Sequence, residues 1–263
     1  MGAMDTSPQN ADGTVGKALH VLDMVAAHMR PVRFNDILSD SPYPKATLYR
    51  LLQTLTNQGM LSFDSDSGTY APGIRLVRLA HSAWRQSSLA PLARPHLDAL
   101  SSQVQETIHL AQLDRGQVLY VDKRNAATPV EMFSQAGKVG PGYCTGVGKA
   151  MMAFLNDEAR EDAIRHQSYF RHTEHTLTTP DALRAELDAI RSRGIAYDRE
   201  EHEVGIICIA APILLPGGRM IGALSITTST QHKSLKDLDQ LEPMLQACAN
   251  NIAGAAENWQ FPS

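Results

Sequence analysis

The stretch GYCTGVGKAM, from Gly142 to Met151, has the residue types of a phosphate-binding loop. Such a loop needs four residues between its first glycine and a Gly-Lys pair, followed by Ser or Thr to hold magnesium. Here five residues separate Gly142 from Gly148, and Ala150 stands where the hydroxyl should be. The stretch therefore does not predict a nucleotide site. A glycine-rich turn that opens a helix can still offer free N–H groups to a carboxylate, or it can be a tight packing turn.

The cysteines Cys144, Cys208 and Cys248 form no even set and have no CxxC spacing, which indicates a reducing compartment. Cys144 lies near an expected helix start, where the pKa of a thiol can fall. A thiol enzyme also needs a base and an oxyanion site, and His202 is the one candidate base nearby in the sequence. The pattern shows no catalytic triad.

Two polar clusters have residue types that can bind metals. His172–His175 lies in a polar loop and lacks the HExxH spacing of a helical zinc site. Asp198–Glu203 is an acidic run, and such runs are usually solvated faces. We expect no metal site and no cofactor, with a divalent ion in the acidic run as a minor possibility.

Composition is that of a globular protein. The chain has 263 residues, 43% hydrophobic and 20% charged, with a net charge of −4. Its apolar runs are too short to span a bilayer and no signal peptide is visible, so we expect a cytoplasmic protein. Residues 1–13 are expected to form a disordered tail, and the opening Met-Gly-Ala-Met resembles an expression scar before a natural start at Met4. The first 80 residues hold seven basic and seven acidic side chains, so a basic patch would have to be local.

Three helices and a hairpin are predicted at the N-terminal end. Apolar residues recur at helical spacing from Thr14, a plausible N-cap, and Pro31 ends that helix. A short helix is expected over 33–38 and a third over 45–58, the latter stopped by Gly59. Two short strands around Asp64–Gly68 form a hairpin. This order is typical of a winged helix-turn-helix over residues 14–73.

The outer face of the third helix suits DNA. Its N-terminal half can enter the major groove, where Arg50 can pair with guanine and Gln53 with adenine. Lys45, Thr47 and Tyr49 suit contacts with the DNA phosphates. The predicted DNA-binding residues are Lys45, Thr47, Tyr49, Arg50 and Gln53. The alternative for each helix alone is an amphipathic bundle with a solvated face.

The segment PYPKATLYRLLQTLTNQGMLSFDSDSGTYAPGIRLVRLA resembles the DNA-binding part of the IclR family of bacterial transcriptional regulators. Ala46 stands where that family usually has serine. Ala71-Pro72-Gly73 replaces the aliphatic residue and glycine that usually end this segment in the family. RGIAYDREEHEVGIICIAAPI, residues 193–213, and GYCTGVGKA resemble two further blocks of the family. The resemblance covers the rest of the chain.

The resemblance implies an α+β fold: an N-terminal winged helix-turn-helix, a linker helix over 74–88, and a GAF-like effector domain over 89–263. The effector domain would have an antiparallel sheet flanked by helices. The pattern agrees, predicting strands over 107–113, 117–123, 129–134, 204–215 and 220–227. Helices are expected over 89–105, 149–155, 157–166, 181–193 and 234–258.

In relatives the glycine turn forms a wall of an effector pocket, so the resemblance implies an effector site here. Carried over by residue, it comprises Gly146, Val147, Asp198, Cys208, Ser225 and Thr227. Ser225 and Thr227 alternate on one face of a strand, which fits a shared cavity. Candidates for an apolar part, for each of which core packing is the better alternative, are Met132, Tyr143, Met151 and Leu155.

We therefore expect a transcriptional regulator, not an enzyme. It would repress a catabolic operon by binding double-stranded operator DNA as a homodimer or a tetramer built as a dimer of dimers. A small metabolite, expected to be a carboxylate, would control it, with no membrane partner. Ile74, Val77 and Trp84 are the expected dimer contacts. The rival hypotheses are a thiol-based redox or GAF-like enzyme with a DNA-binding arm, and a ligand-independent architectural protein.

Overall fold

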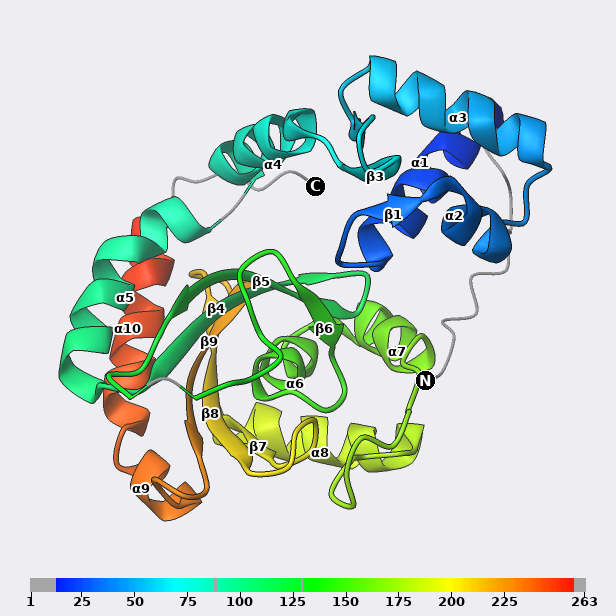
Figure 1. Ribbon diagram of the computed structural model, residues 1–263. Coiled ribbons are helices and arrows are strands. Elements are labelled where there is room, and N and C mark those ends of the chain that lie inside the picture. Colours follow the sequence, from blue (N-terminus) through cyan, green and yellow to red (C-terminus); the bar gives the residue numbers. More distant parts are fainter. Residues whose placement is uncertain (1–12, 88, 129, 258–263) are drawn as a thin grey trace. The chain divides into compact units, whose positions relative to one another are not determined.

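A computed structural model describes residues 13–87, 89–128 and 130–257. The chain divides into two compact units, the first ending at Gln86 and the second beginning at Ser87 (Figure 1). Each unit combines helices with an antiparallel sheet, so the fold is α+β as predicted. The predicted tail lies outside the described residues except for Gly13, which begins the first helix.

Three helices form the body of the first unit: α1 (Gly13–Ala27), α2 (Phe34–Asp40) and α3 (Lys45–Asn57). Thr14, predicted as an N-cap, lies inside α1. Arg33 and Asp36 form the cap of α2, with the Arg33 amide donating to the Asp36 carboxylate at 3.2 Å. The apolar faces of these helices meet in a core that includes Val21, Val25, Ile37, Leu48, Leu51, Leu52 and Leu55.

The predicted hairpin is present as β2 (Leu61–Asp64) and β3 (Thr69–Pro72). A short strand that the sequence did not reveal, β1 (Val32–Arg33), pairs with β3 on its other side, giving the order β1-β3-β2. Gly73 ends the hairpin where a Cβ atom would lie 2.2 Å from the Gly59 carbonyl oxygen. Only glycine permits this approach, which closes the hairpin onto the end of α3.

Helix α4 (Ile74–Ser87) begins at the residue predicted for the linker helix. Ile74 and Val77 are exposed, whereas Leu76 packs against the core of the first unit. The predicted contact residue Trp84 has a side chain that lies outside the described part of the structure.

The second unit contains one antiparallel sheet in the order β6-β5-β4-β9-β8-β7. The long central strands β4, β9 and β8 carry most of the pairing. The bounds are β4 Thr107–Asp114, β5 Gln117–Arg124, β6 Val139–Pro141, β7 Ala196–Arg199, β8 Ile206–Leu214 and β9 Met220–Ser229.

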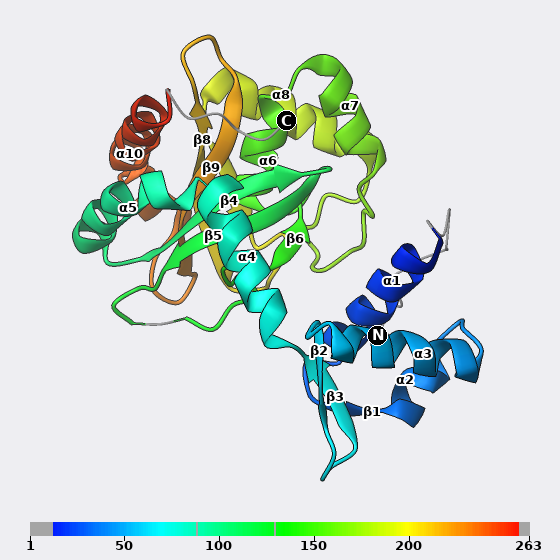
Figure 2. The same cartoon turned by 90° about the horizontal axis from the view of Figure 1, so that it is seen from above.

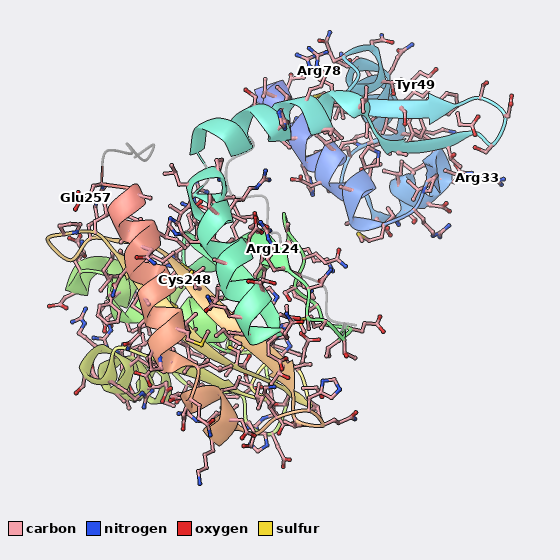
Figure 3. The ribbon with its side chains drawn as sticks, turned by 90° about the vertical axis from the view of Figure 1, so that its left-hand side faces the viewer. Arg33, Tyr49, Arg78, Arg124, Cys248 and Glu257 are labelled. Carbon is pink, nitrogen blue, oxygen red and sulfur yellow. The ribbon has the colours of Figure 1, made fainter. Side chains whose placement is uncertain are left out.

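Helices cover both faces of this sheet. On one face α5 (Ala90–Val104) and α10 (Glu242–Ala255) lie side by side, with Cys248 on α10 (Figure 3). On the other face lie α6 (Gly146–Ala153), α7 (Asp157–Arg165) and α8 (Pro180–Arg193) (Figure 2). The short helix α9 (Leu235–Asp239) follows β9. Helix α6 is buried along its whole length between the sheet and α8.

The ends of α8 show how local sequence sets these elements. The Thr179 hydroxyl accepts from the Ala182 amide at 3.2 Å, and Pro180 occupies the first turn, where its missing N–H leaves no bond unmade. Gly194 ends the helix at a φ of +82°, in the left-handed region that glycine adopts readily. The residues at both ends of α8 therefore account for its boundaries.

Two predicted elements of this unit are wrong. Residues 130–134 form no strand, and Pro129 lies outside the described residues; β5 pairs instead with β6. The helix expected over 234–258 is two helices within the described part, because Pro243 in the first turn of α10 cannot continue a helix from upstream. The sequence prediction also missed β7.

Candidate functional site

Helix α3 presents the predicted DNA-binding residues on its outer side. Lys45, Tyr49, Arg50 and Gln53 are exposed, and Thr47 is half-buried at the edge of this face. The opposite face packs into the core. Neither Lys45 nor Arg50 forms an ion pair with any residue that the structure describes. Both cations are thus available to an external anion.

Aromatic side chains lie beside this face. The Tyr49 and Phe34 rings meet edge to face with centroids 6.2 Å apart. The ring centroids of Phe63 and Tyr70 lie 4.7 Å apart. The Asp64 carboxylate accepts from Ser67 Oγ at 2.7 Å and from the Asp66 amide at 3.0 Å. These bonds lower the pKa of Asp64, so this aspartate is ionised and shapes the hairpin turn.

A second set of polar residues meets on the face of the six-stranded sheet that α6 covers. Asp198 pairs in register with Cys208, and Cys208 pairs with Thr227, so one row crosses β7, β8 and β9. In the next row Ser225 on β9 pairs with His109 on β4. Because alternate residues of a strand share a face, all five side chains lie on the same side of the sheet.

Helix α6 begins directly above this row. A Cβ atom on Gly146 would lie 2.4 Å from the Cys208 sulfur, so glycine is required for the helix to sit this close to the sheet. Thr145 precedes the helix but donates its hydroxyl to the Pro141 carbonyl at 2.8 Å and does not cap the first turn. The amides at the start of α6, including those of Gly146 and Val147, have no partner within the helix.

All six residues predicted for the effector site line one cavity between the start of α6 and the sheet. Met132, a candidate for the apolar part, also lines it. Tyr143, Met151 and Leu155 belong instead to the hydrophobic core around α6, and the Tyr143 hydroxyl donates to the Phe170 carbonyl at 2.5 Å. The full lining is His109, Tyr120, Met132, Ser134, Thr145, Gly146, Val147, Asp198, His202, Glu203, Ile206, Cys208, Ser225 and Thr227.

The cavity is small. Its volume of about 30 Å³ has room for a few waters at most. Residues 130–138, which we call the cap segment, contribute Met132 and Ser134 to its lining. The Phe133 amide donates to the Glu203 carboxylate at 3.1 Å, and Lys123 Nζ donates to the Ser134 carbonyl at 2.8 Å. A larger occupant requires the lining to move, and the cap segment is a loop held by these bonds.

His109 and Ser134 are site residues that sequence reasoning missed. His109 Nδ1 lies 3.2 Å from the hydroxyls of both Ser225 and Thr227, and Nε2 lies 2.7 Å from Ser134 Oγ. One signal could have revealed His109: its polar ring lies between Ile108 and Leu110 in an otherwise apolar strand. Its partners lie on β9 and the cap segment, far away in the sequence.

Burial controls the charges in the cavity. Burial, aided by Lys123, lowers the pKa of His109 to about 3, so the ring is neutral at physiological pH. Burial and the neighbouring Glu201 raise the pKa of Asp198 to about 7, so its carboxyl is partly protonated near neutrality. Burial also raises the pKa of Cys144 and Cys208, so neither thiol is an activated nucleophile.

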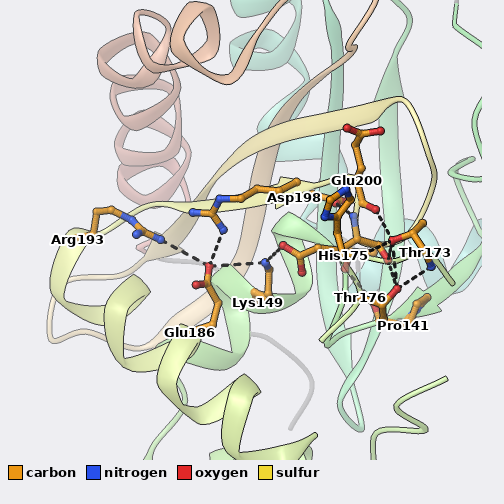
Figure 4. Close-up of polar contacts among 12 residues, drawn as sticks. Pro141, Lys149, Thr173, His175, Thr176, Glu186, Arg193, Asp198 and Glu200 are labelled. Carbon is orange, nitrogen blue, oxygen red and sulfur yellow. Dashed lines mark hydrogen bonds and ion pairs between the residues drawn. The ribbon is translucent and has the colours of Figure 1, made fainter. Parts of the chain in front are cut away.

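The lysine of the glycine-rich stretch does not face an open loop. Lys149 is fully buried, forms an ion pair with Glu201, and lies 3.6 Å from a Glu186 oxygen (Figure 4). Arg193 and Arg199 reach the same Glu186 oxygen at 3.7 and 3.2 Å. Lys149 is therefore a structural cation, which agrees with the absence of a phosphate-loop motif.

The histidine pair at 172 and 175 does not assemble a metal site. His172 lies against the His202 ring with centroids 4.8 Å apart, and Thr173 Oγ1 donates to the Glu200 carbonyl at 2.6 Å. Within the described residues no group of three or more His, Cys, Asp or Glu side chains could hold a metal ion. No described helix combines the length and apolarity needed to cross a bilayer.

Comparison with known families decides what kind of protein has this architecture. Residues 14–65 match the IclR helix-turn-helix domain, and residues 81–254 match the C-terminal domain of bacterial transcriptional regulators of the IclR type. The chain belongs to the IclR family. It is a DNA-binding transcriptional regulator, and the curated relatives that it matches are named as regulators and not as enzymes.

Individual relatives match over most of their length. The regulator KdgR of Escherichia coli is 32% identical over 218 residues, which is 83% of each chain. The transcriptional repressor IclR of the same species is 26% identical over 86% of this chain and 83% of its own. An IclR homologue from Microbacterium hydrocarbonoxydans, solved with 4-hydroxybenzoate, shares the fold with a TM-score of 0.78 and 24% identity, covering 92% of this chain and 98% of that one.

Proposed function

We propose that this IclR-family regulator represses a catabolic operon and is released from, or held on, its operator by a small carboxylate effector. The effector binds in the cavity under the start of α6. The observation that carries this proposal is the convergence of six predicted residues on one small cavity. A relative named as a transcriptional repressor supports repression as the direction of control.

Neutral donors can hold a carboxylate in this cavity. The amides at the start of α6 point along a helix whose N-terminal end carries a partial positive charge. Asp198, where its carboxyl is protonated, can add an O–H donor. The described lining residues include no lysine or arginine and His109 is neutral, so the carboxylate is held by these neutral donors.

An effector must widen the cavity to enter, and this requirement links binding to a conformational change. The bonds from the Phe133 amide to Glu203 and from Ser134 to His109 hold the cap segment down. A ligand that separates them favours the open arrangement by its difference in affinity for the two states. We propose that this change reaches the DNA-binding unit through α4, which joins the units in the sequence.

Operator recognition is assigned to α3. Arg50 and Gln53 read bases, while Lys45, Thr47 and Tyr49 contact the phosphate backbone. One winged helix reads few bases, so specific binding calls for at least two copies on a roughly palindromic site. The exposed Ile74 and Val77 of α4 are the proposed dimer contacts, and a tetramer would pair two such dimers.

The test is a thermal-shift screen of organic, aromatic and sugar acids on the purified chain. A ligand at a hundredfold its dissociation constant should stabilise the fold by about 2.7 kcal/mol. A binding acid should also change the affinity for an operator selected in vitro from random DNA. A blank across all three classes would refute the carboxylate proposal, and an acid that binds without altering operator affinity would refute its regulatory role.

A further inference from the structure

A buried polar cluster occupies one end of the cavity. His109 sits on β4 with its ring packed against Tyr120, the centroids 5.4 Å apart, which fixes its orientation. Three hydroxyls surround it: Ser225 and Thr227 at Nδ1, and Ser134 at Nε2. All of these side chains are buried.

This cluster has more hydrogen-bond donors and acceptors than its members can satisfy among themselves. A neutral imidazole has one donor and one acceptor nitrogen. Nδ1 therefore cannot serve the Ser225 and Thr227 hydroxyls equally, although both lie 3.2 Å away, and those hydroxyls also lie 3.2 Å from each other. At least one hydroxyl retains a donor or acceptor for a further partner.

The bond at Nε2 is the replaceable one. Ser134 belongs to the cap segment, the loop that we propose moves for a ligand to enter, whereas Ser225 and Thr227 are fixed in the central strand β9. When Ser134 leaves, Nε2 is exposed to the ligand. An apolar ligand surface would leave that buried nitrogen without a partner, and sites of this kind strongly reject analogues that lack the matching hydroxyl.

We infer that His109 determines effector specificity by hydrogen-bonding a ligand hydroxyl, so that the effector is a hydroxylated acid rather than an acid without a hydroxyl. This inference rests on the proposed function. A hydroxyl suits Nε2 in either tautomer, because it can donate or accept. Helix α6 starts near Cys208 on β8, and His109 lies two strands further on, about 10 Å away at the usual strand spacing. A short hydroxylated chain can place its carboxylate at one end and a hydroxyl at the other.

The experiment compares acids on the full chain by calorimetry and thermal shift. The probes are gluconate and galacturonate, hexanoate as a chain of similar length without hydroxyls, and benzoate. We expect at least one hydroxylated acid to bind roughly tenfold or more tightly than hexanoate and benzoate. His109→Phe, which keeps a ring against Tyr120, should remove this preference. His109→Gln, which keeps an amide donor and acceptor, should retain part of it and serves if the phenylalanine variant does not fold.

Thr228→Val provides the matched control. Thr228 is buried on the same strand as Thr227 but faces the other side of the sheet, and its hydroxyl has no partner within the described structure. Its removal should leave the ranking of acids unchanged. If hexanoate or benzoate binds the wild type as well as the hydroxylated acids, or if both His109 variants keep the full preference, the inference about His109 is wrong and the carboxylate proposal stands. If no acid of any class binds, the proposed function fails and the inference falls with it.

Discussion

Lys149 and Glu201 form an ion pair in the interior of the second unit, although they lie 52 residues apart in the sequence. The pair joins the glycine-rich stretch to the loop that follows Asp198, because the Glu201 amide donates to the Asp198 carboxylate at 2.8 Å. The second Glu201 oxygen has no partner in the described structure. The position of Asp198 in the cavity therefore depends on the buried ammonium group of Lys149, which holds Glu201 in place.

Replacing Lys149 with methionine should destabilise the protein strongly. The change leaves Glu201 buried without its cation, whereas Glu186 keeps Arg193 and Arg199, and breaking a buried pair from one side costs about 3–5 kcal/mol. Denaturant unfolding followed by circular dichroism measures the effect. Lys236→Met, at an exposed position in α9, is the control and should be nearly neutral. A double variant, Lys149→Met with Glu201→Leu, should recover part of the loss; no recovery would argue against the pair as its cause.

Gly146→Ala should impair both folding and effector binding. The added Cβ would meet the Cys208 sulfur at 2.4 Å, and overpacking of this kind costs about 1–3 kcal/mol. The shift of α6 away from the sheet should also displace the amides that we assign to the carboxylate. Gly254→Ala in α10 is the control, since nothing lies within 4 Å of its Cβ position and alanine favours helix by up to about 1 kcal/mol. Equal melting temperatures for wild type and Gly146→Ala would contradict the contact.

Stability should fall with rising pH because of Asp198. Its pKa is raised from 3.8 to about 7 in the folded chain, so the folded state binds more protons than the unfolded state between these values. The free energy of unfolding contributed by this group therefore decreases as pH rises from about 4 through 7, by at most about 1.4 kcal/mol per pH unit. Asp198→Asn lacks this dependence. The difference between the two unfolding curves should move in favour of the variant from pH 5 to pH 7, and parallel curves would show that Asp198 has an ordinary pKa.

Arg50→Ala should weaken sequence-specific operator binding while effector binding persists. Loss of a bidentate contact to guanine costs about 1–3 kcal/mol, which is roughly fivefold to more than a hundredfold in affinity. Fluorescence anisotropy with an operator selected in vitro measures the first property and calorimetry the second. Arg165→Ala removes the same charge from an exposed position on α7 and should leave operator affinity intact. Loss of both properties in Arg50→Ala would reveal a folding defect instead.

Local patterns predicted the first unit well. The α4 start at Ile74, the polar face of α3 and the hairpin follow from spacing and breakers that act within a few residues. The strand β1 was missed because two residues, Val32 and Arg33, carry no pattern of their own and become a strand only by pairing with β3. The expected strand over 129–134 failed for the opposite reason: its pattern is extended, but bonds to Glu203 and Lys123 hold the segment over the cavity.

The cavity itself was predicted only in part. Ser225 and Thr227 could be placed on one face from their alternation, and the family resemblance supplied Gly146, Val147, Asp198 and Cys208. His109 could not be assigned, because its role depends on the register between β4 and β9, which brings it opposite a residue 116 positions away. Pairing of this kind is set by the whole sheet and leaves no local signal.

The closed cap segment has a consequence for timing. If the proposed effector enters only while the bonds of Phe133 and Ser134 are broken, its association is limited by the fraction of time that the cap segment is open and is slower than diffusion allows. Release requires the same opening. Under the proposed function, an effector once captured would stay bound through brief falls in its concentration, and the regulator would average the supply of its metabolite over the lifetime of the bound state.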